Sequence, residues 1–462
     1  MNTRSIFAII SSIAASTVWA TVIPEVTTAN MLQPENSRAV NITYTLKNAP
    51  AVITLDIETN STENGSVKWS SIGGQAVCNA KGAVWRKVTE ADLKDGVYTI
   101  TWRPDHSWPG HKIAAGGIRA KITAWSLDNP PAYMAVDISN AAKPDTQRYY
   151  QSEEFVPGGV GNAEYKTSSL LMRKIKAKGV VWTMGSTETG RDSTREKTHK
   201  VELPENYYIG VYEVTQAQWL DVAGKFVNAP NYSAEGSMRP AERICFNEVR
   251  TKGGDHNEYP DYYYPKAPEP TSFIGVLRTR TGIDFDLPSE AQWEFAARAG
   301  NGFGYWGDGS ALGETNLKRL GRFLSNNSDV QKNANNKYIF AANTDPREGG
   351  TAIVGSFEAN DWGLYDMYGN VWEMCLDWNM DDIATTLDTS GELFGGRVNI
   401  NLSDPSKRLD GSANANRIIR GGDAVSVFGQ CRASYRDLAH PGYRSSDSKL
   451  VGFRVVCPAE VE

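Results

Sequence analysis

The chain has 462 residues, with 48 Lys and Arg against 54 Asp and Glu and a formal net charge of -6. This length is enough for two or three hydrophobic cores. The acidic balance argues against a general nucleic-acid binder, which needs a basic face. The 42 glycines and 21 prolines predict many turns and a loop-rich or β-rich fold.

Residues 1–20 have the pattern of a secretory signal peptide. Arg4 supplies a short positive region, an apolar stretch runs over residues 6–15, and Val18 and Ala20 stand at the small-residue positions of a cleavage site. The stretch is too short to span a bilayer, and no later run reaches that length. We therefore expect an exported protein, periplasmic or extracellular, that begins at Thr21 and has no membrane span. A buried N-terminal helix is the alternative.

Residues 21–145 alternate apolar and polar side chains in the manner of half-buried strands. Period two leaves one face of each strand buried and the other wet, which predicts an all-β immunoglobulin-like sandwich. The apolar members of the four runs are Val40, Ile42, Tyr44 and Leu46; Ile53, Leu55 and Ile57; Tyr98, Ile100 and Trp102; and Ile118, Ala120, Ile122 and Ala124.

The rest of the chain divides into a linker and a second domain. Residues 146–178 lack sustained periodicity and contain Pro157, Gly158 and Gly159, so we interpret them as a linker. Residues 179–462 combine short strands, Gly- and Asn-rich loops and two short helices, which indicates an α+β domain with little regular secondary structure. One helix follows a cap at Thr215, and the other begins at a Ser289–Gln292 capping box.

The second helix carries charged residues four apart. Glu290, Glu294 and Arg298 share one side of it, and the Glu294-to-Arg298 order is the favourable one for an ion pair along a helix. This spacing predicts a solvent-exposed face.

No transition-metal site is indicated by the five cysteines and five histidines. No C-x-x-C pair occurs, and the histidines are too scattered for a helical zinc site.

Ordered sequence blocks in the second domain resemble one family. They are Trp182-Thr-Met-Gly-Ser186; Glu196-Lys-Thr-His-Lys-Val201 with Tyr212-Glu-Val-Thr-Gln-Ala-Gln-Trp219; Arg239-Pro-Ala-Glu-Arg243; Leu287-Pro-Ser-Glu-Ala-Gln-Trp-Glu-Phe-Ala-Ala-Arg298; and Val354-Gly-Ser-Phe357 followed by Asn360-Asp-Trp-Gly-Leu-Tyr-Asp-Met-Tyr-Gly-Asn-Val-Trp-Glu373, Arg420-Gly-Gly422 and Val451-Gly-Phe-Arg454. The set resembles the formylglycine-generating enzyme, or sulfatase-modifying factor, family. The resemblance implies the family's variant of the C-type-lectin-like fold.

The resemblance also implies calcium sites. Family members bind Ca²⁺ through the turn that corresponds here to Gly369, Asn370, Val371 and Glu373, and oxygen donors at this density suit a hard cation. A second family site would use Asn326 and Asn327, with Asp345 as a poorer match. The alternative is that these turns are held by packing and hydrogen bonds alone.

The family's redox chemistry depends on two cysteines. The enzyme oxidises a cysteine of a sulfatase peptide to formylglycine with O₂ and Cu(I). Two thiolates, from cysteines five residues apart, form a soft site that selects Cu(I). Counting from Arg420 places these positions at Ser426 and Cys431, and Asp423 replaces an active-site serine. A second register, counted back from Tyr435, also leaves the pair broken, so copper is not expected. Cys375 and Cys431 form a candidate thiol pair, with inert buried thiols as the alternative.

A ligand groove can persist after the catalyst is lost. The resemblance places five side chains around it: Trp378, Asp423, Arg432, Tyr435 and Arg436. Aromatic faces and charges suit a peptide or a sugar, although the same residues could equally form core ion pairs. We therefore expect a binding module for a peptide or glycan. The alternatives are a divergent formylglycine-generating oxidase and a structural or surface-assembly protein, and the sequence leaves the oligomeric state open.

Overall fold

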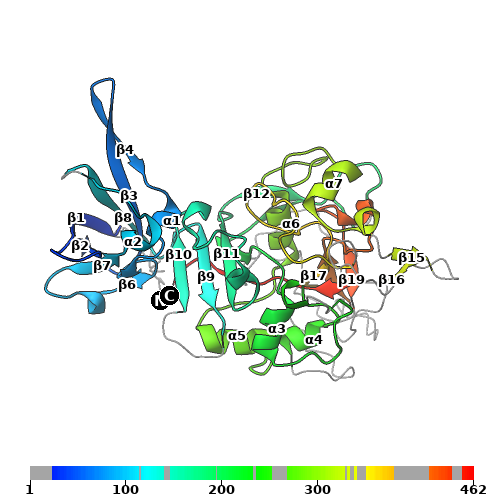
Figure 1. Ribbon diagram of the computed structural model, residues 1–462. Coiled ribbons are helices and arrows are strands. Elements are labelled where there is room, and N and C mark those ends of the chain that lie inside the picture. The colour runs from blue at the N-terminus through cyan, green and yellow to red at the C-terminus, as the bar shows by residue number, and fades with distance from the viewer. Residues whose placement is uncertain are drawn as a thin grey trace, which may run out of the picture.

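The computed structural model describes residues 23–461, except for 114–115, 140–145, 194, 233–235, 252–267, 328–329, 333–337, 341–349, 379–415 and 440–449. Figure 1 shows an N-terminal domain on the left, a larger C-terminal domain on the right and a sheet between them. Among the described residues, no helix has the length and apolar character needed to cross a bilayer. The expected cleavage site falls outside the described residues.

The N-terminal domain is an antiparallel β-sandwich, as the alternating pattern predicts. Ile42 and Tyr44 from one sheet and Ile53, Leu55 and Ile57 from the other are fully buried in a common core. Two four-residue helices, α1 (Gly74–Val77) and α2 (Pro104–Ser107), cover part of it. One sheet has the order β1 (Glu25–Leu32), β2 (Val40–Lys47), β7 (Tyr98–Trp102), β5 (Lys81–Gly82); the other has the order β4 (Ser66–Ser71), β3 (Ala51–Glu63), β6 (Lys87–Val88), with β8 (Ile118–Trp125) also on β3.

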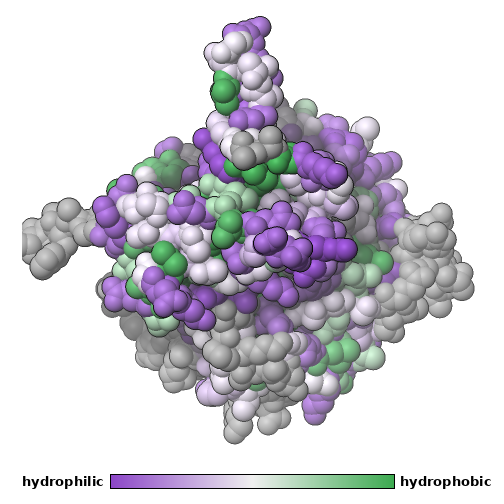
Figure 2. All heavy atoms as spheres, turned by 60° about the vertical axis from the view of Figure 1, so that its left-hand side comes forward, coloured by the Kyte–Doolittle hydropathy of each residue, from purple (hydrophilic) through white to green (hydrophobic). Residues whose placement is uncertain are grey.

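A β-ribbon projects from this sandwich. The ends of β3 and β4 pair from Glu58↔Ser71 to Glu63↔Ser66 and turn at Asn64 and Gly65, which both have positive φ. Figure 2 shows the ribbon standing clear of the body of the molecule. Since its residues are mostly exposed, the ribbon contributes little to the core.

A five-stranded sheet joins the two domains, and its two faces are both buried. On one face, Met134 and Met172 pack in the core of the C-terminal domain. On the other, Tyr133, Ala135 and Leu171 pack in the core of the sandwich. Its strands follow the order β10 (Gln147–Tyr150), β9 (Tyr133–Asp137), β11 (Ser169–Ile175), β14 (Tyr207–Gly210), β21 (Val456–Pro458).

This sheet differs from the sequence-based domain boundaries. The segment 146–178 holds β10, β11 and two 3-10 helices (Glu153–Phe155 and Ala163–Lys166), where a linker was expected. Phe155 and Tyr165 from this segment are buried in the sandwich core, and Gly158 and Gly159 form turns at positive φ. The strands are short and β11 is buried on both faces, so this segment shows no period-two alternation.

Helices and a second sheet complete the C-terminal domain. Trp219 of α3 and Phe273 of α5 stack on one another beneath the joining sheet, with ring centroids 5.2 Å apart. The helices are α3 (Gln216–Ala223), α4 (Phe246–Arg250), α5 (Phe273–Thr281), α6 (Glu290–Arg298) and α7 (Glu314–Leu320). The remaining strands are β12 (Val181–Met184) with β13 (His199–Glu202), β15 (Val330–Lys332) with β16 (Tyr338–Phe340), and the sheet β19 (Asp437–Ala439), β18 (Arg417–Arg420), β17 (Trp372–Trp378), β20 (Val451–Gly452).

The capping box of α6 is present as predicted, but its charged face is buried. Ser289 Oγ accepts a hydrogen bond from Gln292 N at 3.1 Å, and Gln292 Oε1 accepts one from Ser289 N at 3.0 Å. Glu290 and Glu294 are fully buried and Arg298 is nearly so, which contradicts the expected solvent face. Glu294 makes the predicted ion pair with Arg298 at 2.8 Å, but Glu290 and Glu294 are also paired with arginines from distant segments, which a local spacing rule does not register.

Candidate functional site

The turn after β18 brings a glycine against a cysteine. Gly421 and Gly422 follow Arg420 with φ of 95° and 79°, which side chains rarely adopt. A Cβ at Gly422 would lie 2.7 Å from Cys431 Sγ, so the sulfur packs directly on the turn. Cys431 ends a 3-10 helix, Phe428–Cys431, and is fully buried.

Asp423 and Ser426 lock this turn through hydrogen bonds to each other. Ser426 Oγ donates to Asp423 Oδ1 at 2.7 Å and accepts from Asp423 N at 3.0 Å. Asp423 Oδ2 accepts from Leu450 N at 2.8 Å. Both side chains are buried, so they hold the backbone rather than face a ligand.

The two candidate thiols, Cys375 and Cys431, are free and buried in the same apolar cluster. Burial, followed by the charge of Asp423, raises the pKa of Cys431 well above its ordinary value. Burial also raises the pKa of Cys375. A Cu(I) site requires thiolates. The two positions counted from Arg420 supply only the protonated thiol of Cys431 and the hydroxyl of Ser426, which is already hydrogen-bonded to Asp423. These residues do not fit the family's copper pair.

The arginines expected around the groove form ion pairs with buried carboxylates inside the domain. Arg432 donates to both oxygens of Glu196 at 2.8 Å. Burial acts to raise the pKa of Glu196, but the hydrogen bonds from Arg432 and Ser434 outweigh it, so the pKa is lowered. Arg436 makes the same bidentate contact with Glu290, at 2.5 and 2.9 Å. Both arginines therefore form core ion pairs, which was the alternative to a role in binding a ligand.

Glu290 and Glu294 of α6 lie at the centre of this buried network. Arg420 is paired with both carboxylates and donates to Tyr435 O at 2.6 Å. Asp377 Oδ2 accepts a 2.5 Å hydrogen bond from Glu290 N, and burial, with the Glu290 charge, raises the pKa of Asp377 to about 7.

The two aromatic residues of the expected groove have different outcomes. Tyr435 is half-buried and packs on Trp372, with ring centroids 5.9 Å apart. The side chain of Trp378 lies outside the described residues. Of the five expected pocket residues, Asp423, Arg432 and Arg436 are thus buried supports, each bonded to an internal partner of its own.

Exposed apolar side chains lie on the turn that these supports hold. Val427 is 47% exposed and Phe428 41% exposed, directly between Ser426 and Cys431 in sequence. The sequence reasoning missed both, because an apolar residue in a loop gives no local sign of exposure. We call this pair the Val427–Phe428 patch. It is the solvent-exposed part of the segment from Ser426 to Cys431, where counting from Arg420 placed the family's two copper-binding cysteines.

The expected calcium turn is held by internal hydrogen bonds. Glu373 makes a bidentate ion pair with Arg454, both contacts at 2.6 Å, and also accepts from Trp293 Nε1 at 2.7 Å. Asn370 Oδ1 accepts from Ala352 N at 2.7 Å. Gly369 and Val371 flank it, and a Cβ at Gly369 would meet Arg322 O at 2.1 Å. The donor oxygens of Asn370 and Glu373 are engaged, so this arrangement does not fit Ca²⁺.

The second expected calcium site is arranged in the same way. Asn326 Oδ1 accepts from Phe323 N at 2.8 Å, and Asn327 Oδ1 accepts from Gly350 N at 3.0 Å. Asp345 lies outside the described residues. In the described part of the chain, no three His, Cys, Asp or Glu side chains are grouped so that they could hold a metal ion.

Two further buried carboxylates border the Asn370 turn. Glu213 accepts hydrogen bonds from Asn370 Nδ2 at 2.6 Å and Val371 N at 3.3 Å, and burial raises its pKa well above the ordinary value. Burial also raises the pKa of Asp366 to about 6. Both lie within quoted sequence blocks, but nothing in those blocks shows that distant chain segments bury them.

Comparison with known proteins identifies the C-terminal domain. The family described as "Sulfatase-modifying factor enzyme 1-like domain" matches residues 167–459. The chain belongs to this family. The match begins inside the expected linker, at the strand that joins the two domains, and the resemblance and fold class predicted from the sequence are confirmed.

Several proteins are similar to parts of the chain. The serine/threonine-protein kinase Pkn1 of Chlamydia trachomatis is 24% identical over 70% of this chain and 42% of its own length. The chaperone protein LppX of Paenibacillus barcinonensis is 29% identical over 42% of this chain and 69% of its own. The formylglycine-generating enzyme of Thermomonospora curvata is 35% identical over 36% of this chain and 50% of its own length. The chain thus spans about four tenths of the length of the kinase relative.

Among solved structures, Treponema denticola variable protein 1 matches with a TM-score of 0.42 and 22% identity, over 63% of this chain and 95% of that one.

Proposed function

We propose that this protein is an exported binding module of the sulfatase-modifying factor family, and that the Val427–Phe428 patch contacts a peptide ligand. The observation that carries the proposal is the turn at Gly422, where Asp423, Ser426 and a buried Cys431 hold an exposed apolar pair in place of a thiolate pair. A rigid turn with two exposed apolar side chains can dock a peptide at little entropic cost.

Two further points support a peptide over a glycan. The patch offers aliphatic and aromatic surface for the apolar side chains of a peptide, while the guanidiniums expected to orient a peptide or a sugar are paired internally. One relative, LppX, is named a chaperone protein, which fits a polypeptide ligand.

The ligand is tested by selecting peptides from a random display library on the mature chain, residues 21–462. Selected peptides should bind a Val427→Asp, Phe428→Asp double variant at least about tenfold more weakly, as expected when a central apolar contact is lost. Leu220→Asp with Val227→Asp is the matched control, because these side chains are 46% and 54% exposed elsewhere. Equal loss in both variants, or binding of glycans alone on an array, contradicts the proposal.

A divergent formylglycine-generating oxidase is the competing function, and it needs copper. Anaerobic titration with Cu(I) should give no tight one-to-one complex, because the counted thiol pair is incomplete. Tight stoichiometric binding that Cys431→Ser abolishes would establish the oxidase instead.

Export rests on the pattern in residues 1–20 and is tested separately. N-terminal sequencing of protein recovered outside the cytoplasm should begin at Thr21. Recovery of the chain only from the cytoplasm, with Met1 retained, contradicts export.

A further inference from the structure

A cavity of about 80 Å³ lies beside the joining sheet, and its lining includes neither residue of the Val427–Phe428 patch. Its floor consists of the buried side chains of Met134, Tyr149, Tyr208 and Cys457. A volume of this size is large enough to hold several water molecules or a short alkyl chain.

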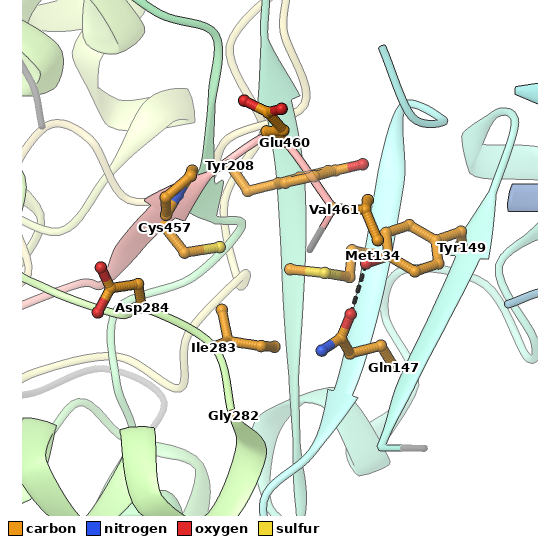
Figure 3. Close-up of a pocket in the computed structure, with 11 residues that line it drawn as sticks. Met134, Gln147, Tyr149, Tyr208, Gly282, Ile283, Asp284, Cys457, Glu460 and Val461 are labelled. Carbon is orange, nitrogen blue, oxygen red and sulfur yellow. Dashed lines mark hydrogen bonds between the residues drawn. The ribbon is translucent and has the colours of Figure 1, made fainter. Parts of the chain in front are cut away.

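Two walls of the cavity come from segments that the fold holds in place. Gly282 ends α5 at φ 68° and directs Ile283 and Asp284 over the sheet. After β21, the chain runs on as a tail whose Val461 N donates to Leu127 O at 2.9 Å. Figure 3 shows Asp284 at the left of the lining residues, Glu460 at the top, and Gln147 and Tyr149 at the right.

The rim of the cavity carries two carboxylates, one of which is held in an ion pair. Asp284 is 63% exposed and paired with Arg278 at 2.5 Å. Glu460 is exposed and has no ion-pair partner among the residues that the structure describes. Gln147 Oε1 accepts a 2.5 Å hydrogen bond from Tyr149 Oη, which fixes the amide at the opposite side. Burial, followed by the charge of Asp284, raises the pKa of Cys457, so the thiol on the floor is neutral.

Apolar walls, a neutral floor and an anionic rim select one kind of ligand. Methylene groups would gain by contact with Met134, Ile283 and the ring of Tyr149. A carboxylate would be repelled by Glu460, whereas a cation at the rim would be attracted by it. We propose that this cavity binds an unbranched alkylammonium group, the chemistry shared by a lysine side chain and a free aliphatic amine.

The test follows the methyl group of Met134 by NMR in the full mature chain, labelled with ¹³C at the methionine methyls. Residues 21–462 contain eight of the nine methionines of the sequence, and Met134→Leu assigns the signal. The probes are n-butylammonium, N-acetyl-lysine methylamide and its uncharged norleucine analogue. The two amines should shift the Met134 signal with dissociation constants on the order of 1 mM, typical of ligands with few heavy atoms. Binding of butylammonium without the lysine compound assigns the site to free amines, and binding of both extends it to lysine side chains.

Two variants test the contacts. Glu460→Gln should weaken binding of the amines about tenfold, while Glu25→Gln, an exposed glutamate of β1, should leave it unchanged. Ile283→Trp should fill the cavity and abolish binding, and unchanged signals from the other methionines will show that the fold is intact. Equal binding of the norleucine analogue, full binding by Glu460→Gln, or no saturable shift of Met134 overturns the proposal.

Discussion

Glu373 and Arg454 form a bidentate ion pair in the interior of the C-terminal domain, with both side chains almost fully excluded from solvent. Removing one partner of such a pair leaves a buried charge without compensation. Glu373→Gln should therefore lower the free energy of unfolding by about 3–5 kcal/mol, measured by urea denaturation. Glu63→Gln, which removes an exposed ion pair with Lys68 on the projecting ribbon, should cost less than about 1 kcal/mol. Similar costs for the two variants would contradict this assignment.

The same geometry makes a prediction about calcium. Because Asn370 and Glu373 use their oxygens internally, millimolar Ca²⁺ and EDTA should give equal melting temperatures. A ligand that binds only the folded state stabilises it by roughly 2.7 kcal/mol at a hundredfold excess over Kd, so binding would be readily visible. A calcium-dependent rise that Asn327→Ala removes would instead locate an ion at the second family site.

The steric contact between Gly422 and Cys431 can be measured with a double-mutant cycle. Gly422→Ala should cost about 2–4 kcal/mol, because its Cβ would meet Sγ at a strained φ. Adding Cys431→Ala should recover roughly 1 kcal/mol of this loss, since the sulfur is gone. Gly429→Ala is the control, because a Cβ there meets no atom within 4 Å. Strict additivity of the first two substitutions would show that the contact is absent.

Burial of Asp377 next to Glu290 predicts a pH dependence. The pKa of Asp377 is raised from its ordinary value of 3.8 to about 7 in the folded protein, so the native state binds the proton more tightly than the unfolded state. The free energy of unfolding contributed by this group is thus highest below pH 4 and falls as pH rises toward 7. Asp377→Asn should have a higher free energy of unfolding than the parent. The difference should grow with pH and reach up to about 4 kcal/mol at pH 8. A difference that does not change between pH 4 and 8 would rule this out.

Continuity of the two cores predicts that the domains unfold together. Residues 146–178 supply strands and core residues to both, so limited proteolysis should spare this segment. A fragment of residues 21–145 should lack a cooperative melt by circular dichroism, because it loses the partners of β9, while residues 21–462 should melt in one transition. A folded 21–145 fragment would show that the boundary predicted from the sequence is also a folding boundary.

Local patterns predicted the parts of this fold that local physics determines. The alternation over Val40–Tyr44 marks a strand with one wet face, and the Ser289–Gln292 box marks a helix start. The joining sheet was missed because its strands are buried on both faces and pair with partners far away in sequence. The same reason applies to Glu290, whose four-residue spacing to Glu294 looks like a solvated face until Arg420 and Arg436 are known to cover it.

The order of the strands in the joining sheet also bears on how the chain reaches its native state. β14 lies between β11 and β21, so one of its two edges stays without a partner strand until residues 456–458 have left the ribosome. Contacts of such high sequence separation slow folding, since a long loop must close before they form. The joining sheet can therefore be completed only when almost the whole chain has been synthesised.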